Sequence, residues 1–116
     1  MASGRTKLSE LVSWAKPNAD WCIEVADYYN VPVTVTSVWR SWEEQDALYK
    51  RWLNGGSVYP ANPPGQSAHE YRMAWDSTVD PVYQGWWDYV RELAGFYVPS
   101  NDRIHAAVPD WRSYVG

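Results

Sequence analysis

The sequence has one cysteine and one phenylalanine among its 116 residues, and it lacks any long uniform apolar run. A single cysteine excludes an internal disulfide, so nothing indicates folding in an oxidising compartment. We expect Cys22, set among apolar residues of a helical pattern, to be a buried and unreactive thiol. The first residues, MASGRTKLSELVSW, contain no apolar signal-peptide core. The expectation is a protein made in the cytoplasm, with no signal peptide, no transmembrane segment and no membrane partner.

Clusters of positive charge are also missing. Ten Lys and Arg residues stand against fourteen Asp and Glu, which gives a net charge of −4 and an isoelectric point near 5.0. Binding to nucleic acid through phosphate neutralisation requires the opposite balance. The composition therefore argues against a nucleic-acid partner.

Aromatic residues are abundant, with nine Trp and nine Tyr. Both side chains combine a large apolar body with a polar tip, so they suit a half-buried groove as well as a core. Two interpretations stay open: aromatics that fill a small core, or aromatics that line a groove for a carbohydrate or peptide polymer. The chain length predicts a single domain over residues 1–116.

The apolar spacing predicts helices over residues 6–15, 18–30, 41–56 and 80–94, and strands over residues 31–39, 70–78 and 103–108. Residues 57–67 contain three prolines and a glycine and are predicted to form a loop. The β-branched run 31–39 is expected to be a central strand. Because helices and strands mix without regular βαβ alternation, the fold class is predicted as α+β, a small antiparallel sheet with helices packed on it.

Local signals mark where these helices begin and end. Pro17 is expected to close the first helix and Asn18 to cap the second. Ser41 and Glu44 have the spacing of a capping box, and Leu48, Trp52 and Leu53 follow as an apolar stripe. Asp80 and Pro81 are expected to begin the last helix.

His69 and His105 are the only imidazoles, and each has a carboxylate nearby: Asp76 seven residues after His69, and Asp102 three residues before His105. Two histidines and a carboxylate are a common catalytic zinc set. Seven residues of helix rise about 10 Å, and an odd spacing in a strand puts side chains on opposite faces. His69 and Asp76 can share an ion only if the chain bends between a turn and a strand. A surface histidine and a turn aspartate without a shared role are the alternative.

Three motifs, TSVWRSWEEQDALY, PPGQSAHEYRMAWD and DRIH, together resemble the M15 family of zinc peptidases. The family pattern has S-x-x-R-S before a helix with Gln and Leu-Tyr, then S-x-H-x-x-G-x-A-x-D, and finally E-x-x-H. The matches run in order over residues 33–107. The resemblance implies an M15-like fold and hydrolysis of peptidoglycan stem peptides, as in D-Ala-D-Ala carboxypeptidases and phage L-Ala-D-Glu endolysins.

By this resemblance His69, Asp76 and His105 would be the ligands of Zn²⁺. Asp102 would stand where the family has its general base, and Arg40 would hold the scissile carbonyl and its developing oxyanion. Substrate contacts are assigned in the same way to two residues, Ser67 and Gln45.

Two residues depart from the family pattern. Asp102 is one methylene shorter than the usual glutamate, which puts its reach to the attacking water in question. Arg72 replaces a glycine, and we expect it to point outward, to occupy substrate space, or to pair with Asp76 or Glu70. Two functions stay open: a cell-wall hydrolase of phage origin (an endolysin acting after lysis, or a virion component), or a catalytically impaired M15-like fold that serves as a phage structural or binding protein among other virion proteins. An unrelated α+β domain is the third interpretation.

Overall fold

The computed structural model describes residues 2–115. Over this range the α-helices are α1 (Lys16–Tyr28), α2 (Trp42–Leu53) and α3 (Gln84–Leu93), and the strands are β1 (Thr34–Ser37), β2 (Ala74–Thr78) and β3 (His105–Ala107). Short 3₁₀ helices lie between them: η1 (Arg5–Glu10), η2 (Ala68–Tyr71), η3 (Pro81–Tyr83) and η4 (Trp111–Tyr114). None of the helices in residues 2–115 has the length and apolar character needed to cross a bilayer.

The three strands form one antiparallel sheet in the order β1-β2-β3, which confirms the predicted α+β class. The expectation that the run 31–39 is a central strand is wrong, because β2 holds that place. The free side of β1 is covered by the N-terminal segment: the Ser3 NH donates to the Val33 carbonyl and the Val35 NH donates to the Ser3 carbonyl, each over 2.8 Å. Val33 and Val35 are nevertheless fully buried. Helices and the N-terminal segment bury these side chains, which explains why this edge strand has the apolar, β-branched sequence expected of a central one.

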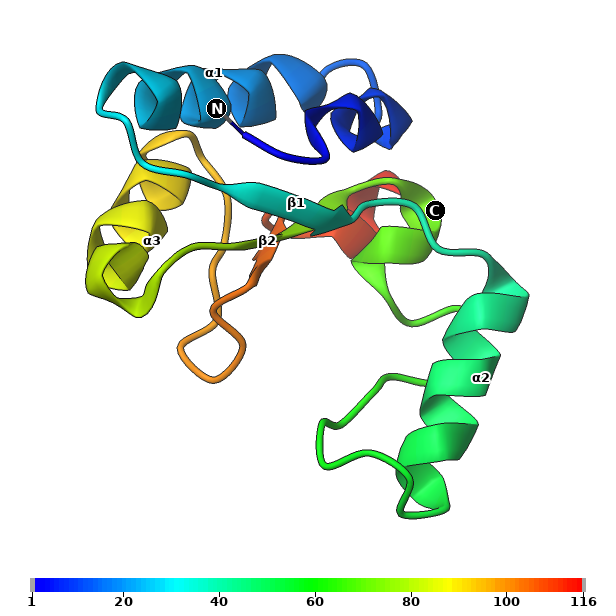
Figure 1. The fold of residues 1–116 in the computed structure, drawn as a ribbon. Helices are drawn as coiled ribbons and strands as arrows, with labels where there is room; N and C mark the ends of the chain where they lie inside the picture. Colours follow the sequence, from blue (N-terminus) through cyan, green and yellow to red (C-terminus); the bar gives the residue numbers. More distant parts are fainter. Residues whose placement is uncertain (1, 116) are drawn as a thin grey trace.

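Helices α1 and α3 cover the sheet, whereas α2 extends away from the body of the molecule (Figure 1). The core between them is built on Trp75, Trp87 and Ile23. The predicted capping box of α2 is present, with Ser41 and Glu44 as its two members. The apolar stripe along α2 is not part of the core: Leu53 is 58% exposed, and Gln45 is the buried residue of this helix.

The N-terminal region differs from the predicted helix over residues 6–15. It forms η1 followed by turns, and Leu8, Leu11 and Ala15 are buried from this irregular path. Pro17 lies in the first turn of α1 and does not end a preceding helix, and Ala15, not Asn18, is the N-cap. Proline is well tolerated there because the first helical NH groups have no partner within the helix.

The remaining boundaries agree more closely. Residues 57–67 contain no helix or strand, as predicted. Asp80 caps a short η3 that leads into α3, and Gly95 follows that helix with a φ of 98°. The predicted strand 103–108 is shortened to three residues.

The cysteine provides a first test of this packing. Cys22 is fully buried, and burial raises the pKa of its thiol to about 12. A raised pKa keeps the thiol protonated and unreactive at neutral pH. We expect no reaction with a disulfide reagent at pH 8 in the native state, and one thiol per chain in denaturant, measured by absorbance. Rapid labelling of the native protein would contradict this arrangement of α1.

Candidate metal centre

The chain bends between His69 and Asp76, as their spacing requires. His69 lies on η2, and Asp76 lies on β2. Ser67 is the N-cap of η2, its hydroxyl accepts from the His69 NH over 3.3 Å, and the Glu70 carboxylate accepts from the Ser67 NH over 3.1 Å. The predicted strand 70–78 is therefore wrong in its first half, because this capping box makes a helical turn there.

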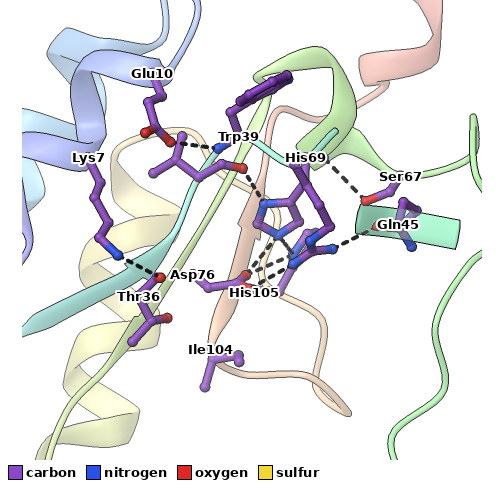
Figure 2. Close-up of polar contacts among 12 residues, drawn as sticks. Lys7, Glu10, Thr36, Trp39, Gln45, Ser67, His69, Asp76, Ile104 and His105 are labelled. Atoms are coloured by element: carbon purple, nitrogen blue, oxygen red, sulfur yellow. Dashed lines mark hydrogen bonds and ion pairs between the residues drawn. The ribbon is translucent and has the colours of Figure 1, made fainter. Parts of the chain in front are cut away.

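Three side-chain atoms converge from separate elements (Figure 2). His69 Nε2 lies 3.0 Å from Asp76 Oδ1, and His105 Nδ1 lies 3.2 Å from the same oxygen. The two ring nitrogens are 3.2 Å apart. The sheet register sets part of this geometry, because Asp76 on β2 lies directly opposite His105 on β3.

The protonation of His69 follows from its other nitrogen. Nδ1 lies 2.6 Å from the Val38 carbonyl oxygen, which can only accept a hydrogen bond, so Nδ1 carries a proton. In the neutral ring, Nε2 then directs a lone pair toward the group. A second-sphere carbonyl of this kind commonly orients a metal-binding histidine.

This donor set fits a metal ion. Lone pairs of His69 Nε2 and the Asp76 carboxylate face each other over 3.0 Å, and such a contact requires a proton or a cation between them. Tetrahedral zinc with bonds of about 2.0–2.1 Å separates its ligand atoms by about 3.3–3.4 Å, close to the three distances here. The group can therefore hold a divalent ion that accepts imidazole and carboxylate ligands.

The Asp76 carboxylate is ionised in this setting. Burial by itself raises the pKa of this carboxyl, but hydrogen bonds from the His105 and His69 rings, when these carry the proton that a metal ion would replace, oppose burial and leave the pKa well below its usual range. The site thus contains a buried anion, which attracts a cation.

Arg40 lies beside the group, with Nη2 at 3.8 Å from Asp76 Oδ2. Its Nη1 donates to Gln45 Oε1 over 2.9 Å, and Gln45 Nε2 in turn donates to the Asn62 carbonyl over 2.7 Å. Gln45 is only 2% exposed. Its amide therefore orients Arg40, and the predicted substrate contact of Gln45 stays untested.

The other two residues predicted for the site, Ser67 and Asp102, differ from each other in burial. Ser67 is buried and its hydroxyl caps η2. Asp102 is exposed on the turn before β3, where its carbonyl accepts from the His105 NH over 3.1 Å. Within residues 2–115 no hydrogen bond or ion pair joins the Asp102 carboxylate to the three converging side chains.

Arg72 points away from the group, toward the N-terminal segment. Its guanidinium lies 4.8 Å from the centre of the Trp39 ring and donates to the Glu10 carbonyl over 3.3 Å. It forms no ion pair with Asp76 or Glu70. Its φ of 61° is left-handed, a conformation that glycine adopts without strain.

Two supports of the site were not predicted from the sequence. The Val38 carbonyl is a backbone group, so no side-chain pattern reveals it. Glu10, whose carboxylate accepts from the Trp39 NH over 3.0 Å, lies far from the motif in sequence. Glu70 was detectable, because S-A-H-E has the spacing of a capping box.

Two hollows flank the group. A cleft of about 1050 Å³ has His105 among its lining residues, together with Glu92, Tyr97, Pro99, Trp111 and Arg112. A smaller hollow of about 390 Å³ includes Trp39, Arg40, Trp42 and Tyr71 in its lining. Aromatic side chains thus contribute to both hollows as well as to the core.

Neither a protein-family model nor a curated protein matches the chain. Solved structures do. The LD-carboxypeptidase LdcB, described in terms of peptidoglycan recognition, is 20% identical with a TM-score of 0.67, over 90% of this chain and 68% of that one. A mutant of the vancomycin-resistance D,D-pentapeptidase VanY in complex with Zn(II) is 18% identical with a TM-score of 0.67, over 88% of this chain and 74% of that one. The L-Ala D-Glu endopeptidase ChiX of Serratia marcescens is 18% identical with a TM-score of 0.57, over 100% and 95%.

These likenesses show the fold. The chain has the fold of M15-type peptidases, which confirms the predicted M15-like architecture. On this fold His69, Asp76 and His105 form a group that can hold a metal ion, with ligand atoms within 4.8 Å of one another.

Arg72, whose φ is left-handed, provides a test of the bend between His69 and Asp76. Arg72→Ala keeps a Cβ at positive φ but loses the Trp39 stack, whereas Arg72→Gly also loses the stack but removes the backbone strain. We expect the Gly variant to be more stable than the Ala variant by about 1 kcal/mol, measured by urea denaturation. Equal stabilities, or a more stable Ala variant, would show that this backbone geometry is wrong.

Proposed function

We propose that this chain is a zinc-dependent peptidase that hydrolyses stem peptides of peptidoglycan. The observation that carries the proposal is the convergence of His69 Nε2, Asp76 Oδ1 and His105 Nδ1 beside Arg40. Two histidines and a carboxylate leave one position of a zinc ion open for water or substrate. The proposal is supported by the similar folds of an LD-carboxypeptidase, a Zn(II)-bound D,D-pentapeptidase and an L-Ala D-Glu endopeptidase.

Zn²⁺ held by these three side chains would polarise the scissile carbonyl and lower the pKa of a bound water to about 7. The Val38 carbonyl keeps His69 in the tautomer that presents Nε2. An arginine guanidinium is positively charged at neutral pH, and Gln45 holds that of Arg40 beside the site. In the proposed mechanism this fixed positive charge stabilises the oxyanion that develops on the substrate.

Asp102 is the proposed general base. It lies three residues before His105 on a turn that the backbone fixes. Its carboxylate is exposed, and in the proposed reaction it would accept the proton of the attacking water. Either hollow beside the group offers room for a peptide.

A second candidate function rests on the same residue. Because no hydrogen bond or ion pair joins the Asp102 carboxylate to the converging side chains in residues 2–115, a catalytically impaired fold that serves as a phage structural or binding protein is the alternative. A role as a phage endolysin or virion-associated hydrolase is a narrower proposal, and its support is the sequence resemblance alone.

Zinc binding is tested first through stability. We expect Zn²⁺ at 100 times its dissociation constant to stabilise the wild type by about 2.7 kcal/mol, and His69→Ala to lose both the bound zinc and the stabilisation. Metal content and melting temperature with and without Zn²⁺ measure this. Asp102→Asn is the matched control, because it removes a carboxylate that is not a ligand. Equal zinc content in wild type and His69→Ala would overturn the ligand assignment.

Activity is tested by release of amino groups from purified peptidoglycan, with and without a chelator. We expect zinc-dependent release by the wild type and a loss of about 10²-fold or more in Asp102→Asn, with zinc still bound. Mass spectrometry of the released fragments then identifies the bond that is cut.

The variant Asp102→Glu separates the two candidate functions. Release by this variant and none by the wild type would support the impaired fold, in which one methylene is missing. No release from either protein, with zinc bound to both, would favour the binding function.

A further inference from the structure

One face of α3 carries Gln84, Asp88 and Arg91, four and then three residues apart, so the three side chains point the same way. They meet the turn that precedes His105. Arg91 Nη2 donates to the Arg103 carbonyl over 2.7 Å, and Nη1 donates to the Ile104 carbonyl over 3.3 Å. Arg91 is 0% exposed. A buried guanidinium thus holds two consecutive carbonyls of this turn.

Asp88 completes the contact. Its Oδ1 accepts from Arg91 Nη2 over 2.7 Å and from Gln84 Nε2 over 2.8 Å. Its Oδ2 accepts from Arg103 Nε over 2.6 Å. The turn is therefore held both by its carbonyls and by the side chain of Arg103.

The same contacts extend to both strands that carry proposed ligands. The Ile104 carbonyl also accepts from the Ser77 NH over 3.0 Å, and Ser77 Oγ accepts from Trp87 Nε1 over 2.9 Å. Ser77 follows Asp76, and Ile104 precedes His105. The hydrogen bonds made by α3 thus reach the chain neighbours of both Asp76 and His105.

Burying an arginine at this position is energetically unfavourable in itself. Removing its charge from water is unfavourable unless hydrogen bonds and an opposite charge compensate for the lost hydration. Burial lowers the pKa of Arg91 and Asp88 opposes that change, so the guanidinium stays charged. What an apolar residue cannot do is hold two carbonyls at fixed positions.

We infer that Arg91 is a positioning residue, which fixes the turn at Arg103 and Ile104 so that His105 Nδ1 stays in place beside Asp76 and His69. The consequence for metal binding rests on the proposed function. The consequence for the backbone does not, because the turn is held by protein contacts alone.

The test compares Arg91→Met with Arg91→Lys, and uses Arg51→Met on the exposed face of α2 as a matched control. In Arg91→Met we expect Zn²⁺ binding to weaken by about 10- to 100-fold, measured by competition with a chromogenic chelator. In the metal-free protein we expect the amide NH groups of Ser77 and His105 to exchange with solvent at least about ten times faster relative to those of α1.

Arg91→Lys is expected to lie between, since one ammonium cannot reach both carbonyls and Asp88 in the geometry of the guanidinium. Arg51→Met is expected to match the wild type in both measurements. If Arg91→Met does not fold, Asp88→Asn, which removes the charge that holds Arg91, is measured with the same expected direction.

Two results would overturn the inference: zinc binding and exchange of Arg91→Met equal to those of Arg51→Met, or faster exchange that spreads equally over α1, which is global destabilisation. A wild type that binds no Zn²⁺ would overturn the proposed function instead. The exchange rates of Ser77 and His105 then decide the role of Arg91 by themselves.

Discussion

A buried anion, the carboxylate of Asp76, determines how the elements around it are arranged. An ionised carboxylate removed from water must be matched by cations or hydrogen-bond donors. His69 approaches it from η2, His105 from β3, and Arg40 from the junction of β1 and α2. Each of these elements is short, and the helix α2 lies largely outside the core. The carboxylate gives these separate segments a common point of contact, and a bound cation would strengthen that contact further.

The bend between His69 and Asp76 shows how the backbone reaches this arrangement. Neither a continuous helix nor a continuous strand brings two side chains seven residues apart to one atom. The chain makes one turn of η2, which Ser67 and Glu70 cap, and leaves it through Arg72 in the left-handed region. A glycine would make the same exit without strain. Arg72 instead offsets the strain with its stack on Trp39 and its hydrogen bond to the Glu10 carbonyl. Because its side chain points away from His69, Asp76 and His105, this departure from the M15 pattern does not disturb them.

The sequence predicted the parts of the fold that local chemistry decides. Ser41 and Glu44 cap α2 as their spacing indicates, and the need for a bend after His69 followed from the spacing alone. The errors arose where tertiary packing decides. Residues 6–15 have helical apolar spacing, yet they bury Leu8 and Leu11 as a 3₁₀ turn and an irregular segment tied to β1. The edge position of β1 and the Val38 carbonyl behind His69 depend on partners distant in sequence, which no local pattern encodes.

Asp102 is the departure that bears on the proposed catalysis, and its surroundings limit how the protein can compensate for the shorter side chain. A backbone shift of Asp102 toward His69, Asp76 and His105 would bring the shorter carboxylate closer to an attacking water. The carbonyls of Arg103 and Ile104, however, are held by Arg91, and the carbonyl of Asp102 itself accepts from the His105 NH. Such a shift would break these bonds and move His105 as well. As the proposed base, Asp102 would therefore have to act through its own side-chain rotation or through movement of the substrate, because the contacts that fix the proposed ligand His105 also fix the turn that carries Asp102.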